Sequence, residues 1–215
     1  MIIQPIWQSL NRKLVAILRG IEPAETAAIV SSLIDLGFEA IEIPLNSPDP
    51  FTSIATAVEV AKAKKPEGCF IGAGTVLTVD EVNKIRDCGG NLIVSPNANP
   101  DVISATVANG MFSMPGVLTP TDAHSALAAG ASVLKFFPAS VLGPSGIKAI
   151  KAILPKDLEI CAVGGVGPGN FADYLGAGVN GFGIGSNLYS AGLSLEEIEK
   201  RAKEIMAAYD KVTAG

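Results

Sequence analysis

The sequence predicts an α/β protein: a single (β/α)8 barrel (a TIM barrel) that spans residues 1–215 and has a short N-terminal helix before its first strand. Short apolar runs alternate with amphipathic segments along the whole chain, which is typical of a parallel sheet. The apolar runs lack polar alternation, as expected for strands covered on both faces. An open doubly wound sheet would show the same alternation. Eight such units in about 200 residues favour the barrel, whose usual size is roughly 250 residues.

The elements follow in a regular order. Proline or threonine stands near the start of several expected helices and glycine near their ends, as is typical of helix caps. The expected strands are Leu14–Leu18, Ala40–Ile43, Cys69–Gly72, Leu92–Val94, Met111–Met114, Ser132–Phe136, Glu159–Val163 and Gly181–Ile184. The expected helices are Pro23–Leu36, Pro50–Lys64, Val79–Cys88, Pro100–Asn109, Thr121–Ala129, Ile147–Leu154, Pro168–Leu175 and Leu195–Tyr209.

The composition and charge of the chain limit the classes of function that it can have. The net charge of −5 argues against a nucleic-acid groove, which needs a basic face. The three cysteines have no Cys-x-x-Cys spacing, and no signal peptide or unbroken apolar span is visible, so we expect a cytoplasmic protein without a membrane segment. The single histidine, His124, cannot build a usual zinc site with dispersed cysteines, so the sequence predicts no metal.

Lys135 is the most informative residue. It lies in the run Val133–Pro138, which otherwise predicts a fully buried strand. A buried ammonium group costs free energy unless it is paired or loses its proton. A neutral lysine amine attacks carbonyl carbon, so this position predicts Schiff-base chemistry.

Two other strands carry polar groups that converge with Lys135. Alternation along the strands places Arg19, Glu42 and Lys135 on faces that would point into one barrel. Together they offer an amine nucleophile, a carboxylate for proton transfer and a guanidinium for a substrate carboxylate. In the alternative interpretations, Lys135 and Glu42 are a buried ion pair that fixes register, and Arg19 binds a loop carbonyl at the rim.

Further polar or small residues follow other strands. Thr75 comes after the third strand, where it could bind substrate or cap the next turn. Gly164 and Gly165 follow the seventh strand, and Gly185 and Ser186 follow the eighth. Barrel phosphate sites use these two loops, because glycine lets backbone N–H groups approach an anion. The alternative is that the glycines only make tight turns.

At this point the chain resembles the 2-keto-3-deoxy-6-phosphogluconate/6-phosphogalactonate aldolase family over essentially its whole length. The motifs that carry the resemblance are Ala16-Ile17-Leu18-Arg19-Gly20, Ile41-Glu42-Ile43-Pro44-Leu45-Asn46-Ser47, Ile71-Gly72-Ala73-Gly74-Thr75-Val76-Leu77, Leu134-Lys135-Phe136-Phe137-Pro138 and Val163-Gly164-Gly165-Val166. The resemblance implies a class I aldolase, a carbon–carbon lyase that is usually a homotrimer. It implies no metal or organic cofactor.

The resemblance also implies roles for individual residues. Lys135 would form the Schiff base and Glu42 would move protons. Arg19 and Thr75 would hold the pyruvyl carboxylate, with Pro96 packed against it. The four residues Gly164, Gly165, Gly185 and Ser186 would hold phosphate. Asn46 and Val163 match the phosphogalactonate branch of the family, whereas the phosphogluconate branch usually has Arg and Thr there. The implied substrate is 2-dehydro-3-deoxy-6-phospho-D-galactonate, cleaved to pyruvate and D-glyceraldehyde 3-phosphate.

Three other functions stay open on the sequence alone. The same chemistry could act on the phosphogluconate epimer, or on both epimers. A different phosphate-binding barrel enzyme, such as an isomerase or epimerase, would run on acid–base pairs and would not need Lys135. A sugar-phosphate binding protein would keep the glycine loops but gain nothing from Lys135 beside Glu42.

Overall fold

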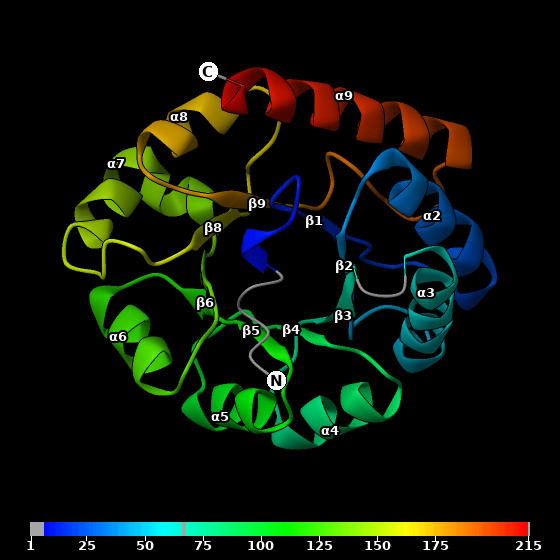
Figure 1. Cartoon of the computed structure of the whole chain (residues 1–215), viewed down its shortest axis with the longest axis horizontal. Helices are drawn as coiled ribbons and strands as arrows, with labels where there is room; N and C mark the ends of the chain where they lie inside the picture. The colour runs from blue at the N-terminus through cyan, green and yellow to red at the C-terminus, as the bar shows by residue number, and fades with distance from the viewer. Residues whose placement is uncertain (1–6, 66–67, 215) are drawn as a thin grey trace.

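The computed structural model describes residues 7–65 and 68–214. Parallel strands form a ring that is surrounded by helices (Figure 1). The strands are β1 (Leu14–Ile17), β2 (Ala40–Pro44), β3 (Phe70–Gly74), β4 (Leu92–Val94), β5 (Phe112–Met114), β6 (Gly116–Val117), β7 (Leu134–Phe136), β8 (Ile160–Val163) and β9 (Gly181–Ile184). The helices are α2 (Pro23–Leu36), α3 (Pro50–Lys64), α4 (Val79–Asp87), α5 (Pro100–Ala108), α6 (Pro120–Ala128), α7 (Ala139–Lys151), α8 (Phe171–Gly176) and α9 (Leu195–Thr213).

The predicted (β/α)8 barrel is confirmed. The strand order is β5-β4-β3-β2-β1-β9-β8-β7-β6, and every pairing is parallel. The two ends of this order, β5 and β6, are separated only by Pro115, so they are two halves of one strand and the chain itself closes the ring. Proline has no backbone N–H to give to the ladder, which explains the interruption at this residue. Eight βα units therefore remain.

Several predicted boundaries were wrong. The last helix, for example, runs on to Thr213, past the predicted end at Tyr209. The third strand runs on to Gly74, past the predicted end at Gly72. The sequence predicted a helix that begins at Ile147, but α7 begins at Ala139. Its first turn was not predicted because the non-helical Gly143 separates this turn from the rest of the helix. Helix α8 begins only at Phe171, because Asn170 folds the preceding residues into a turn by accepting a hydrogen bond from the Gly167 N–H.

A small apolar cluster lies inside the ring of strands. Its members are buried and come from inward-facing positions of the strands and from Trp7 and Leu10. The Trp7 ring stacks on Phe112 at 5.2 Å and lies 6.0 Å from Phe70. The predicted N-terminal helix is present as a helical turn at Trp7 and Gln8, in front of the ring in Figure 1, and the rest of that prediction lies outside the described residues. This cluster packs the barrel interior at the end where Trp7 lies.

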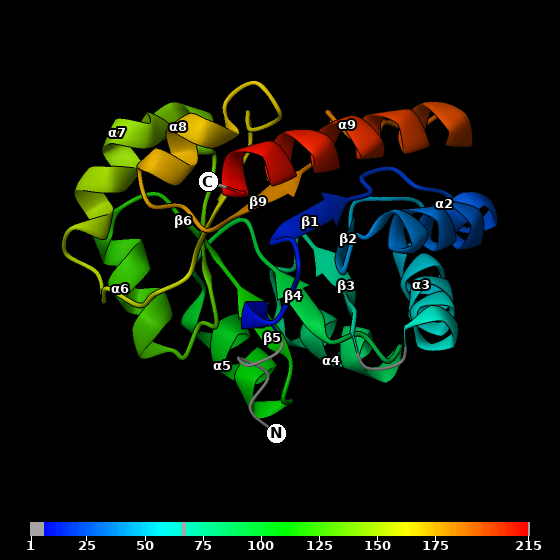
Figure 2. The same cartoon turned by 45° about the horizontal axis from the view of Figure 1, so that its top comes forward.

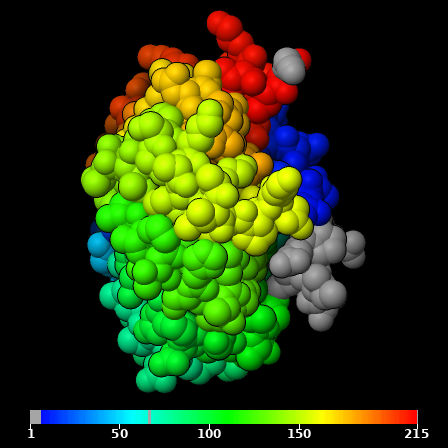
Figure 3. Space-filling view, turned by 90° about the vertical axis from the view of Figure 1, so that its left-hand side faces the viewer, coloured from blue at the N-terminus to red at the C-terminus, as the bar shows by residue number. Residues whose placement is uncertain are grey.

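A larger cluster packs the strands against the helices. In the side view of Figure 3, the side chains of α6, α7 and α8 form a continuous surface on this face of the molecule. Figure 2 shows that α9 crosses near α2, beside β1, and so completes the helical layer. In the part of the chain that the structure describes, no helix combines the length and the apolar character that crossing a membrane requires.

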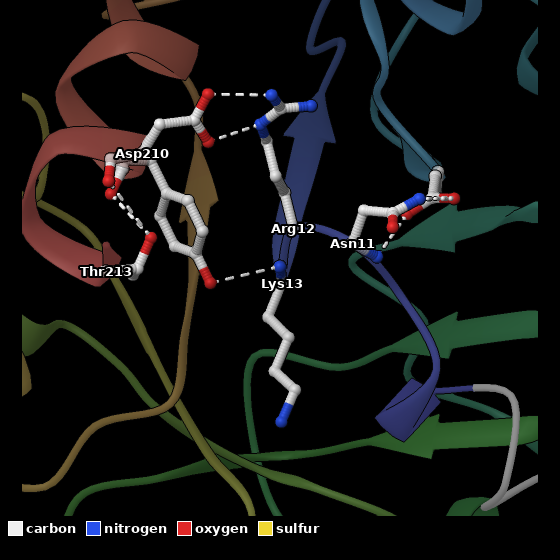
Figure 4. Close-up of polar contacts among 7 residues, drawn as sticks. Asn11, Arg12, Lys13, Asp210 and Thr213 are labelled. Carbon is white, nitrogen blue, oxygen red and sulfur yellow. Dashed lines mark hydrogen bonds and ion pairs between the residues drawn. The ribbon is translucent and has the colours of Figure 1, made fainter. Parts of the chain in front are cut away.

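Polar contacts attach the last helix to the first strand (Figure 4). The guanidinium of Arg12 donates two hydrogen bonds to the Asp210 carboxylate, at 2.6 and 2.7 Å. The Tyr209 hydroxyl accepts a hydrogen bond from the Lys13 N–H at 3.2 Å. Because Lys13 immediately precedes β1, these contacts join the two ends of the barrel chain.

Candidate active site

Glu42 and Lys135 project into the barrel from different strands. Glu42 is the middle residue of β2 and Lys135 the middle residue of β7. The inward row includes Val15, which pairs with Ala40, and Cys161, which pairs with Lys135. Both charged residues are buried, Glu42 with 4% and Lys135 with 5% of its surface exposed. Of the three residues predicted to converge inside the barrel, Glu42 and Lys135 are buried there, whereas Arg19 is exposed.

The two charged groups do not form the direct ion pair of the alternative interpretation. Oε2 of Glu42 is buried and accepts no hydrogen bond from any described residue. The Lys135 Nζ lies 4.9 Å from the centre of the Phe137 ring, close enough for a cation–π contact. A buried carboxylate oxygen without a partner has hydrogen-bonding capacity left for a substrate.

Burial changes the acidity of both groups. Desolvation lowers the pKa of Lys135 from 10.5 to about 8, although the Glu42 charge opposes this shift. Desolvation raises the pKa of Glu42 to about 7, although the charges of Lys135 and Arg19 oppose it. Both groups therefore titrate near neutral pH, where a nucleophile and a proton-transfer group are most effective.

Gly74 makes room for the Glu42 carboxylate. A Cβ at this position would lie 1.5 Å from Oε2 of Glu42. The next residue, Thr75, is half-buried and has φ of 59°, an uncommon conformation for a β-branched side chain. Thr78, not Thr75, caps the following helix, and its hydroxyl accepts from the Glu81 N–H. The strained Thr75 thus directly follows Gly74 and does not serve as that cap, so its strain needs another reason, and such strain clusters at functional sites.

Arg19 and Asn46 meet at the rim of the barrel. Arg19 follows β1, Asn46 follows β2, and both are exposed. Nη1 of Arg19 donates a hydrogen bond to Oδ1 of Asn46 at 2.5 Å. The structure therefore agrees with the alternative for Arg19, at the rim on a loop carbonyl, except that this carbonyl belongs to a side chain. The Arg19 charge still reaches the interior, because it lowers the pKa of both Glu42 and Lys135.

The two glycine loops are neighbours because β8 and β9 pair, with Val163 opposite Gly183. Gly164 and Gly165 have φ of 91° and 77°, so both need glycine. Val163 is buried directly before them. Gly185 has open space where a side chain would be, and Ser186 is exposed. The four predicted phosphate residues therefore lie on adjacent strand ends.

Asparagines that the sequence reasoning missed hold these loops. Nδ2 of Asn187 donates to the Val166 carbonyl at 2.9 Å and so joins one loop to the other. Nδ2 of Asn170 donates to the Gly165 carbonyl at 2.9 Å. A Cβ on Gly164 would touch Phe137 and Pro138 at 3.4 Å, which places this loop against the residues that follow Lys135. The asparagine that follows each glycine loop within a few residues was the signal in the sequence that could have found these contacts.

The remaining predicted residue, Pro96, is half-buried after β4. A Cβ on Gly116 would lie 2.3 Å from the Pro96 carbonyl oxygen, so the two backbones approach closely. Arg19, Thr75, Pro96, Gly164 and Gly185 all stand at the C-terminal ends of parallel strands. They share the rim at which barrel enzymes carry their active sites.

Comparison with known proteins assigns the family. The family described as "Aldolase: KDPG and KHG aldolase" matches residues 7–204. The chain belongs to this aldolase family. It is 59% identical over 206 residues to a "Probable 2-dehydro-3-deoxy-6-phosphogalactonate aldolase" of Rhizobium meliloti (strain 1021), covering 96% of this chain and 95% of the relative. It is 47% identical to the "2-dehydro-3-deoxy-6-phosphogalactonate aldolase" of Escherichia coli (strain K12), covering 94% and 97%.

A solved structure agrees with these relatives. The aldolase described here superposes on the "Native KDPGal structure" with a TM-score of 0.91 and 45% identity, covering 95% of this chain and 98% of the other. Aldolases are carbon–carbon lyases. The fold, the buried amine and the family assignment therefore all agree with the predicted enzyme class.

Proposed function

We propose that the chain is a class I aldolase that cleaves 2-dehydro-3-deoxy-6-phospho-D-galactonate to pyruvate and D-glyceraldehyde 3-phosphate. The observation that carries the mechanism is the Lys135 amine, buried inside the barrel with its pKa lowered to about 8. The substrate is supported by the relatives that are 59% and 47% identical and carry the name of phosphogalactonate aldolases.

Lys135 begins the reaction as a neutral amine. Its nitrogen attacks the keto carbon of the substrate and forms a carbinolamine. Glu42 moves the protons that turn the carbinolamine oxygen into departing water, and a protonated Schiff base remains. This cation withdraws electrons from the neighbouring carbons, so the lysine itself supplies the electron sink. We expect activity to need no metal or organic cofactor and to survive EDTA.

Glu42 then acts as the base for bond cleavage. It takes the proton of the hydroxyl on carbon four, and that carbon becomes the aldehyde of glyceraldehyde 3-phosphate. The electrons of the broken bond between carbons three and four pass into the Schiff base and give an enamine. Protonation at carbon three and attack of water release pyruvate and restore the Lys135 amine. A Glu42 pKa of about 7 suits both halves of this proton cycle.

The substrate would lie across the rim. Arg19 and Thr75 would hold the carboxylate beside the keto carbon, with Pro96 packed against that end. Two glycine loops would hold the phosphate, with ligands from Gly164, Gly165, Gly185 and Ser186. Val163 and Asn46 would line the part between and favour the phosphogalactonate epimer. We also propose that the enzyme works as a cytoplasmic homotrimer.

Borohydride trapping tests this proposal. Pyruvate and borohydride should give a stable adduct on the protein, and peptide mapping by mass spectrometry should locate it on Lys135. The trapping rate should rise with pH and be half-maximal near pH 8, because only the neutral amine attacks. Turnover of the two epimers, measured side by side, tests the substrate.

Three results would contradict the proposal. Unchanged turnover in Lys135→Ala would favour an isomerase or epimerase. Binding of sugar phosphates without turnover would indicate a binding protein. Faster cleavage of the phosphogluconate epimer would overturn the choice of substrate and leave the Schiff-base chemistry intact.

A further inference from the structure

Two consecutive residues after β2 hold two consecutive residues after β1. The Asn46 side chain accepts a hydrogen bond from the Arg19 guanidinium. The Ser47 hydroxyl, which is 8% exposed as a residue, accepts one from the Gly20 N–H at 2.9 Å. Both the side chain of Arg19 and the backbone beside it are therefore fixed by the neighbouring loop.

The Arg19 guanidinium needs such support because no carboxylate of a described residue holds it. Among the described residues its guanidinium forms no ion pair with a carboxylate, and Glu42 acts on it only at a distance. Long exposed arginine side chains lose much conformational freedom when they are held in one position. A neutral acceptor supplies orientation and leaves the positive charge available for an anion.

We propose that Asn46 is a positioning residue that holds the Arg19 guanidinium ready for the carboxylate of the pyruvyl group. This inference rests on the proposed function, because it assumes that pyruvate reaches Lys135. It assigns Asn46 an effect at the carboxylate end of the substrate, in addition to any contact with the sugar chain. The amide is important because an aspartate here would pair with Arg19 and compete with the substrate carboxylate.

The substitution Asn46→Asp tests the inference with almost no change in shape. Asn46 is exposed, and Nδ2 donates no hydrogen bond to the described residues, so the fold should tolerate the change. We expect the pyruvate concentration that gives half-maximal borohydride trapping to rise about tenfold, as is typical when a charge-assisted bond is lost. The trapping profile should also move to higher pH, because a negative charge at the rim opposes the lowering of the Lys135 pKa by Arg19.

Asn83→Asp is the matched control. The Asn83 Oδ1 accepts a hydrogen bond from Nη1 of Arg86 on α4, so the same substitution is made beside another arginine, in the outer helical layer. We expect its half-maximal pyruvate concentration and pH profile to match those of the wild type. Equal changes in both variants would show a general charge effect and overturn the inference.

A double-mutant cycle separates action through Arg19 from direct contact. In an Arg19→Met background, Asn46→Asp should cause no further loss of pyruvate trapping. Since the adduct is detected by mass, a slow variant still gives a rate. A further loss as large as in the wild-type background would overturn the inference, as would an unchanged Asn46→Asp. If the wild type itself forms no pyruvate adduct, the proposed function fails first, and that result is separate.

Discussion

At the scale of single residues, a missing side chain positions the acid. Gly74 has an ordinary backbone conformation, but a Cβ there would overlap Oε2 of Glu42 at 1.5 Å. In Gly74→Ala only the end of the Glu42 side chain has to move, so we expect little change in thermal stability. The carboxylate would leave its position, and we expect kcat to fall about 100-fold, as is typical of a misplacement of about 1 Å.

Steady-state turnover and thermal melting of the same sample check this prediction. Gly176→Ala is the control, because a Cβ at the end of α8 meets no atom within 4 Å and should leave both quantities unchanged. A Gly74→Ala variant with wild-type kcat would show that the observed Glu42 position is not needed for catalysis.

The Lys135 amine also makes a prediction about stability and pH. Its folded pKa of about 8 lies below the usual 10.5, so between these pH values the unfolded chain holds a proton that the folded chain lacks. Raising the pH through this window therefore stabilises the wild-type fold. Lys135→Met lacks this contribution. We therefore expect the unfolding free energy of Lys135→Met minus that of the wild type to fall as the pH rises from about 8 to about 10.

Urea denaturation at several pH values measures this difference, and the subtraction cancels the common groups that Lys135 does not influence, which excludes Glu42. The control Lys148→Met replaces an exposed lysine on α7 and accounts for the loss of a lysine outside the barrel interior. A pH-independent difference for Lys135→Met would mean that the amine keeps an ordinary pKa in the fold.

The sequence predicted the charged residues of the site better than their support. Alternation along strands was enough to bring Glu42 and Lys135 into one interior, because a period of two residues fixes which side chains face inward. It could not reveal that Gly74 leaves space for Glu42, since that close approach depends on how two strands pair. Asn187 was missed for the same reason, because its partner Val166 lies in another loop.

At the scale of elements, helices with local signals at their ends were predictable, and the starts of α7 and α8 were not. Helix α2 has a proline at its start and Gly37 in the left-handed conformation at its end, so local signals mark both boundaries. Helix α7 has no such start. Its first turn is anchored by a hydrogen bond from the Ser140 N–H to the Gly164 carbonyl, a contact between distant segments that a local pattern does not contain.

The attachment of α9 is a second contact between distant segments, and it can be tested. Tyr209→Phe removes the acceptor of the Lys13 N–H and leaves the aromatic packing in place. We expect the free energy of unfolding to fall by about 1 kcal/mol, as is typical of one buried hydrogen bond. Tyr174→Phe is the control, because Tyr174 is similarly buried and its hydroxyl binds no described residue.

Urea denaturation of the two variants gives the comparison. Equal losses in Tyr209→Phe and Tyr174→Phe would show that the hydroxyl bond to Lys13 adds nothing beyond packing. A larger loss for Tyr209→Phe would show that this bond between α9 and the start of β1 stabilises the closed barrel.

At the scale of the whole molecule, ring closure makes the two ends of the barrel depend on each other. Every strand has a partner on both sides once β5 and β6 are taken as one strand, so no edge is left from which unfolding could begin locally. The apolar cluster around Trp7 fills one end, and the amine and acid stand toward the other. Loss of any strand pairing would therefore disturb both ends together.

This dependence predicts a single cooperative unfolding transition for residues 1–215. Trp7 is the one tryptophan in the sequence and is 1% exposed, so its fluorescence reports on the N-terminal end of the barrel. The rate of pyruvate trapping on Lys135 reports on the opposite end, and circular dichroism reports on the helices. We expect the three signals to change at the same urea concentration, measured at one protein concentration because an oligomer adds a concentration dependence. Separated transitions would mean that the chain contains more than one folding unit, since a closed ring cannot lose one end and keep the other.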